Sequence, residues 1–187
     1  MTRKAAIFLL LIVLTNLAFT AEADTFRGAW LELGFGLSKV DEVMGGGITR
    51  LALLNNDKIY SIHFIDLDDE LAPYSSLAIM RSPEEVNSKI RYFYHVSAFG
   101  VQYGISEGEK SCRLRLSAGL SYVMLSGSTS LDDESVTKVN TIGIPLSADL
   151  DFLIFKHFGL KTSLYANFNS EQPFVFFSLS VMLGRLR

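Results

Sequence analysis

Three histidines and one cysteine are the side chains of this 187-residue chain best suited to bind a metal ion or act as a base or nucleophile. None of the histidines (His63, His95 and His157) stands at a metal-type spacing from another histidine, a cysteine or a carboxylate. Cys112 is the only cysteine, which excludes a disulfide or a thiolate metal site within one chain. We therefore expect no metal ion and no cofactor.

A serine, a histidine and a carboxylate can together cleave an ester when they lie within hydrogen-bonding distance of one another. His63 and His95 are the only candidates for such a site, on two successive predicted strands. No motif specifies the site, so we predict no catalytic residues. An enzyme that modifies membrane lipid, a hydrolase or a transferase, is kept as an alternative.

A second group of reactive side chains is charged and alternates along the chain with large apolar residues. Its members are Glu32, Arg50, Arg113, Arg115, Asp149, Asp151 and Lys161. In a confined interior opposite charges must pair, because an isolated buried charge is very costly. We expect Arg113 and Arg115 to pair with Glu32, Asp149 and Asp151. These pairs would plug the interior, and a narrow porin-like conduit is the functional alternative.

The segments that hold these charges show strict two-residue alternation, which is the period of a β-strand. In residues 113–124 and 141–152 one face is large and apolar, and the other is mostly glycine, serine and charged residues. The inward positions of a narrow barrel favour glycine and serine because there is little internal room. Large apolar side chains then face outward, which is tolerable only in lipid. The pattern predicts a transmembrane β-barrel.

We predict an all-β fold, an eight-stranded antiparallel up-and-down barrel. The expected strands cover about 29–37, 48–54, 58–66, 92–103, 113–124, 141–154, 158–168 and 175–184. Short connections at 55–58, 106–110 and 155–157 alternate with mostly longer ones, as expected for periplasmic turns and external loops. Pro145 requires a bulge or a later start of its strand, because proline removes a donor from the strand pairing.

The connections carry several local signals. Residues 39–47, which end in three glycines, are expected to form a polar connection, and 67–89 the longest loop, with one helical turn at 82–85. The acidic cluster at its start lacks the spacing of a calcium-binding loop and is expected to be solvated; its members are Asp66, Asp68, Asp69 and Glu70. Aromatic residues near the periplasmic strand ends predict an interfacial girdle; these are Trp30, Tyr60, Tyr103, Phe152, Phe155 and Phe158.

The first 23 residues predict an export signal. Arg3 and Lys4 precede an apolar segment, and Ala21 and Ala23 offer a small-x-small cleavage site. We therefore expect a signal peptide over residues 1–23 and a barrel domain over 24–187. The net charge of the whole chain is −3 and stays weakly negative without this segment, which suggests neither nucleic acid nor an anionic surface as a partner.

The succession of alternating strands, with the terminal stretch from Phe174 to Arg187, resembles the small outer-membrane β-barrels of Gram-negative bacteria, the OmpA-type and OmpX-type group. The resemblance covers about residues 29–187 and is one of pattern. It implies location in the outer membrane, contact with its lipid, and insertion by the barrel assembly machinery after passage by periplasmic chaperones. Such chains usually end on an aromatic residue, whereas this one ends on Leu186 and Arg187.

The function expected from the sequence is that of a non-enzymatic outer-membrane barrel with a structural or surface-contact role and a plugged lumen. The lipid-modifying enzyme is one alternative. The other is a periplasmic lipocalin-like barrel that binds an apolar ligand, although a glycine- and serine-rich face argues against it. No sequence feature identifies an external ligand.

Overall fold

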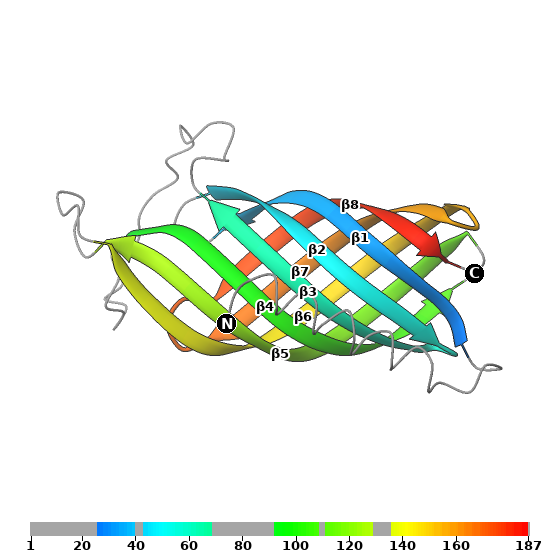
Figure 1. Cartoon of the computed structure of the whole chain (residues 1–187), viewed down its shortest axis with the longest axis horizontal. Coiled ribbons are helices and arrows are strands. Elements are labelled where there is room, and N and C mark those ends of the chain that lie inside the picture. The colour runs from blue at the N-terminus through cyan, green and yellow to red at the C-terminus, as the bar shows by residue number, and fades with distance from the viewer. Residues whose placement is uncertain (1–25, 40–42, 69–91, 109–110, 129–135, 187) are drawn as a thin grey trace, which may run out of the picture.

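The computed structural model describes residues 26–39, 43–68, 92–108, 111–128 and 136–186, which form a single closed barrel (Figure 1). Each strand pairs antiparallel with the next, and β8 pairs with β1 to close the ring. The predicted fold class is confirmed. The strands are β1 (Phe26–Lys39), β2 (Val43–Asn55), β3 (Lys58–Asp68), β4 (Tyr92–Gly108), β5 (Cys112–Ser128), β6 (Thr137–Phe155), β7 (Phe158–Asn169) and β8 (Phe174–Arg185).

The two ends of the barrel differ. The start of β1 and the end of β8 lie at one end, together with the tight connections β2–β3 and β6–β7 (Figure 1). We call this the turn end and the opposite one the loop end. The predicted turn after Asn55 is confirmed, and Asn56 takes the left-handed backbone conformation with φ 53°. No helix among the described residues is long and apolar enough to cross a membrane.

The strands are steeply staggered around the ring. A path along directly paired residues leaves β1 at Ala29, crosses all eight strands and returns to β1 at Lys39, ten residues further along. Eight strands with this stagger tilt by about 40° from the barrel axis and enclose an interior that side chains fill. Any charged group on the inner face is therefore forced against groups from the opposite wall.

The predicted facing of the strands is confirmed. On β1 the outward Leu31 and Leu33 are 37% and 47% exposed, whereas Glu32 between them is fully buried. On β4, Phe99, Val101 and Tyr103 face outward, and the intervening residues face inward. Large apolar side chains thus cover the outside of a barrel whose inside is largely polar at mid-height, the inverse of a water-soluble barrel.

Pro145 is accommodated differently from expectation. β6 runs through it from Thr137 to Phe155, and the register with β5 is the same on both sides of it, so there is no bulge and no later start. The β5–β6 pairing instead skips Ile144 and Pro145, while Pro145 still pairs with Asn167 of β7. Because proline has no backbone N–H, the pairing of β6 with β5 is interrupted at Pro145, while the pairing of β6 with β7 continues through it.

Three connections were predicted too long. Lys39 lies in β1, and Gly45–Gly47 lie in β2, paired with β1 and β3. At position 46 glycine is needed for close strand contact, because a Cβ on Gly46 would lie 2.2 Å from the carbonyl oxygen of Asp66. Ser106 to Gly108, expected in a turn, belong to β4, and Leu67 and Asp68 belong to β3. The expected signal peptide (1–23) and helical turn (82–85) lie outside the described residues.

The aromatic girdle at the turn end needs one correction. Tyr60 and Tyr103 face outward with ring centroids 5.3 Å apart, and Phe155 and Phe158 are 6.4 Å apart. Trp30 is only 3% exposed and points into the lumen, where its ring lies 5.1 Å from the Arg115 guanidinium. Its indole is bound to lumen charges, so Trp30 is no interfacial anchor.

Candidate functional site

Glu32 of β1 is the centre of an ion-pair network at mid-lumen. Its carboxylate lies 2.9 Å from Nη2 of Arg115 on β5 and 3.6 Å from Nη1 of Arg50 on β2, and it contacts Nζ of Lys161 on β7. It also accepts a 2.8 Å hydrogen bond from the indole Nε1 of Trp30. All four side chains are almost fully buried, so each charge depends on the others for its solvation.

Two aspartates of β6 complete the network. Asp149 accepts a 2.6 Å hydrogen bond from Arg50, lies 3.5 Å from Lys161, and accepts a bond from the Ser163 hydroxyl. Asp151 accepts a 2.6 Å bond from Arg115. Their position follows from the register, since β5 and β6 place Arg115 opposite Asp149 and Asp151 one inward position further along. The predicted pairing of Arg115 with Glu32, Asp149 and Asp151 is thus confirmed.

Arg113 lies nearer the turn end than the network. Its Nη1 donates a 3.0 Å hydrogen bond to the backbone oxygen of Leu186, and the register places it opposite Asp151. Leu186 is buried, and its backbone nitrogen donates to the carbonyl of Lys156. Arg113 therefore tethers the end of the described chain across the mouth of the barrel.

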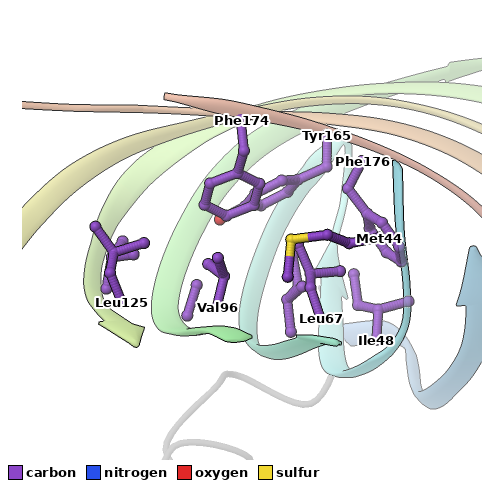
Figure 2. Packing of buried hydrophobic residues seen from close by; sticks show 11 residues of the cluster. Met44, Ile48, Leu67, Val96, Leu125, Tyr165, Phe174 and Phe176 are labelled. Carbon is purple, nitrogen blue, oxygen red and sulfur yellow. The ribbon is translucent and has the colours of Figure 1, made fainter. Parts of the chain in front are cut away.

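Apolar clusters lie on both sides of the charged layer. These two clusters were not predicted from the sequence. At the turn end Trp30, Leu54, Ile59 and Met182 belong to one cluster. The cluster at the loop end is larger, and its side chains converge inside the barrel (Figure 2). It contains Met44, Ile48, Ile65, Leu67, Val96, Ala98, Val123, Leu125, Tyr165, Phe174 and Phe176. The lumen therefore contains an apolar, a charged and a second apolar layer.

His63 belongs to the lumen. Its Nε2 lies 3.1 Å from the hydroxyl of Tyr165, and Asn167 donates both to that hydroxyl, at 3.0 Å, and to Ser121 Oγ, at 2.7 Å. Its ring packs against Gly100, where an added Cβ would lie 2.8 Å from His63 Cε1. His63 is therefore a buried, packed histidine with no access to lipid.

His95 faces the opposite way, so the two candidate histidines do not meet. It lies on the outer surface near the loop end, with Nε2 3.0 Å from Oδ1 of Asp66. Ser97 Oγ donates a 2.6 Å bond to the same oxygen and lies 3.4 Å from His95 Nε2. A serine, a histidine and a carboxylate thus form one cluster on the outer face of β3 and β4. The sequence analysis did not predict this cluster, because it depends on the register between β3 and β4, which pairs Asp66 with Ser97.

No group of three or more metal-binding side chains occurs in the part of the chain that the structure describes. Asp66 and Asp68 lie at the end of β3, while Asp69 and Glu70 lie outside the described residues. Cys112 is a free, half-buried thiol at the start of β5. None of these residues adds a site to those described above.

The closed ring of eight staggered strands, apolar outside and charged inside, is the fold of the small outer-membrane β-barrels, as the resemblance predicted. Neisserial surface protein A superposes with a TM-score of 0.58 at 11% identity, covering 83% of this chain and 95% of that one. The N-terminal barrel domain of Pseudomonas aeruginosa OprF gives 0.56 at 14% identity, covering 85% and 98%. Ail, the attachment invasion locus protein of Yersinia pestis, gives 0.56 at 12% identity, covering 84% and 98%.

At these identities the likeness extends to the fold and no further. No family model matches the sequence, and no curated protein matches it.

Proposed function

We propose that this protein is a non-enzymatic barrel of the outer membrane, with the start of β1 and the end of β8 on the periplasmic side. The observation that carries the proposal is the inverted surface: Leu120, Ile142 and Leu179 are 61%, 71% and 60% exposed on the outer face. So much apolar surface is stable in lipid and would aggregate in water. A lipocalin-like carrier would need an empty apolar lumen, whereas this lumen is filled by ion pairs and side chains.

The role we propose is structural, or one of surface contact made by the segments at the loop end. The lipid of the outer membrane would surround the barrel. Biogenesis would then use periplasmic chaperones and the barrel assembly machinery. The three layers inside the lumen support a closed barrel, because a conduit would require Arg50, Arg115 and Lys161 to leave their carboxylates.

Two measurements test this proposal. The protein should stay with the outer-membrane fraction through a wash at high salt and high pH, and its release by that wash would contradict the location. Reconstituted in planar bilayers, the wild-type protein should show no stable channels of large conductance. Such channels would rule out the closed lumen and favour the porin-like alternative.

A second candidate function is lipid modification, and the cluster of Asp66, His95 and Ser97 favours it. Its place on the outer face is where an ester of a membrane lipid would reach it. Its geometry is not that of a working triad, because His95 and Ser97 both approach the same carboxylate oxygen and Ser97 is only 5% exposed. For this reason the non-enzymatic role is preferred.

The candidates are separated by a serine-reactive fluorophosphonate probe in outer-membrane vesicles. The non-enzymatic proposal predicts no labelling of the wild-type protein above that of Ser97→Ala. Labelling that Ser97→Ala abolishes and Ser117→Ala retains would establish a reactive serine and favour the enzyme.

A further inference from the structure

The wall of the barrel lacks one backbone hydrogen bond between β5 and β6. Gly119 stands opposite Pro145 in the register, and the pairing is interrupted there although Ala118 and Leu146 are paired directly beside it. The pairing of Pro145 with Asn167 of β7 is intact, so the nitrogen of Pro145 points toward β5. Because proline has no N–H, the carbonyl oxygen of Gly119 receives no hydrogen bond from β6. In an antiparallel sheet the N–H and the carbonyl of one residue point to the same neighbouring strand, so β4 supplies no donor either.

This unpaired carbonyl lies at mid-height of the wall. The path of directly paired residues that begins at Ala29 and returns to β1 at Lys39 passes through Ala118, the neighbour of Gly119. Since Ala29 lies at the turn end, Lys39 at the loop end and β5 half-way around the ring, Gly119 stands about half-way between the two ends.

The surroundings of the Gly119 oxygen contain no donor from the described residues. Ser121, at the next inward position of β5, donates its hydroxyl to the carbonyl oxygen of Gly143 at 3.2 Å. On the outer face the side chains beside the interruption are Leu120 and Ile144, which are 61% and 53% exposed and have no polar atom. Hydrocarbon supplies no water at this height, so an unpaired carbonyl favours a ligand that carries a donor.

A hollow of about 540 Å³ opens on the outer face directly beside the interruption. Ala118 and Leu146, the pair next to Gly119, both line it. Two further alanines, Ala148 and Ala166, make room in it between larger apolar residues. Its volume lies in the range of small-molecule sites. The hollow is therefore suited to the apolar body of a ligand, and the Gly119 oxygen stands at its edge as the acceptor.

Charge and depth define the chemistry of this ligand. An ammonium group among alanine and leucine side chains would lack a counter-ion, which is very costly, so the donor must be uncharged. A hydroxyl group meets this condition and needs only one acceptor. The hollow opens to hydrocarbon, where the molecules present are the acyl chains of lipids. Because the carbonyl lies at mid-height, the hydroxyl must stand well along the chain and away from the head group.

We propose that the outer face of β5 and β6 holds a lipid site, in which the hollow takes an acyl chain with a mid-chain hydroxyl group and this hydroxyl donates to the carbonyl oxygen of Gly119. The bound chain supplies the hydrogen bond that Pro145 cannot make. The site rests on the outer-membrane location proposed above, and a failed binding test would leave that location to be decided by fractionation.

The first test is NMR of the wild-type protein in detergent micelles, with ¹³C at the glycine carbonyls and ¹⁵N at leucine. Gly36, Gly119 and Gly159 are the only glycines followed by leucine, so three carbonyl signals are observed. Methyl 12-hydroxyoctadecanoate should move the Gly119 signal downfield and saturably, whereas methyl octadecanoate should not. Gly36 and Gly159, which are paired on both sides, are internal controls. An equal response to the two esters, or no response, would overturn the proposal.

The second test uses two variants. Pro145→Ala restores the backbone N–H, so the Gly119 signal should lie downfield without ester, and the hydroxylated ester should no longer move it. Ala118→Leu fills the hollow and leaves Pro145 in place, and it should weaken binding of that ester by about tenfold. An unchanged response in either variant would contradict the proposal. A Gly119 signal that moves with protein concentration, and not with ester, would show that a second copy covers this face and would also contradict it.

Discussion

Replacing Glu32 by glutamine should be among the most destabilising single substitutions in the barrel. Glutamine keeps the volume of the side chain and can still accept from Trp30, but it leaves Arg50, Arg115 and Lys161 with one carboxylate fewer. Removing one partner from a buried ion pair costs about 3–5 kcal/mol. Because Glu32 is fully buried and serves three cations, we expect a loss of free energy of unfolding in that range.

The same reasoning predicts strong coupling with Lys161. Lys161→Met alone should cost a similar amount, because it leaves a carboxylate without its cation. The double variant restores neutrality, so its loss should be smaller than the sum of the single losses by about 2 kcal/mol. Glu107→Gln is the control: Glu107 is exposed at the end of β4, and its loss should stay below about 1 kcal/mol.

Urea-induced unfolding in phospholipid vesicles measures these differences. Trp30 is the only tryptophan and lies in the network, so its fluorescence reports on the lumen, and circular dichroism supplies an independent signal. Strictly additive losses, or a Glu32→Gln variant within about 1 kcal/mol of wild type, would refute the argument that the charges stabilise one another.

Three further outcomes are expected. Intact mass of the mature protein should show cleavage after Ala23, and a chain that still begins at Met1 would contradict it. Leu116→Arg, on the outer face, should cost about 2–4 kcal/mol in a refolding titration, and the inward Ser117→Thr far less; equal losses would mean that the facing is wrong. Gly100→Ala should lose about 1–3 kcal/mol in a urea titration, because its Cβ would lie 2.6 Å from a backbone oxygen. Gly47→Ala, whose nearest neighbour is 3.7 Å away, should be close to neutral, and a reversed order would show that backbone crowding is not the cause.

The fold could be predicted because a two-residue period assigns every side chain of a strand once one residue is placed. Glu32 fixed the facing of β1, and that parity also required Trp30, two residues earlier, to face inward. The girdle assignment weighed only the residue type and the nearness of Trp30 to the strand end. In the structure the side chain of Trp30 faces inward like that of Glu32, so its position in the alternation, and not its residue type, determines where it lies.

The layers of the lumen were harder to foresee. On β3, Ile59, Ile65 and Leu67 face inward while Tyr60 and Phe64 face outward, so both faces are apolar and alternation gives no contrast. Which inward residues share a level depends on the stagger of all eight strands. The stagger depends on how each strand pairs with its neighbours, and the sequence of one strand alone does not determine this pairing. For the same reason the contact of Asp66 with Ser97 and His95 could not be identified from spacing.

The ion-pair network also bears on how the barrel forms. Lys161 and Glu32 meet although 129 residues separate them along the chain, and Arg115 reaches Glu32 across 83. Contacts of such range form late in folding, because closing a long loop costs entropy before the contact contributes. An incomplete sheet would expose unpaired charges toward hydrocarbon. We therefore expect the final closure of β1 against β8 to be all-or-none, with partly inserted states sparsely populated.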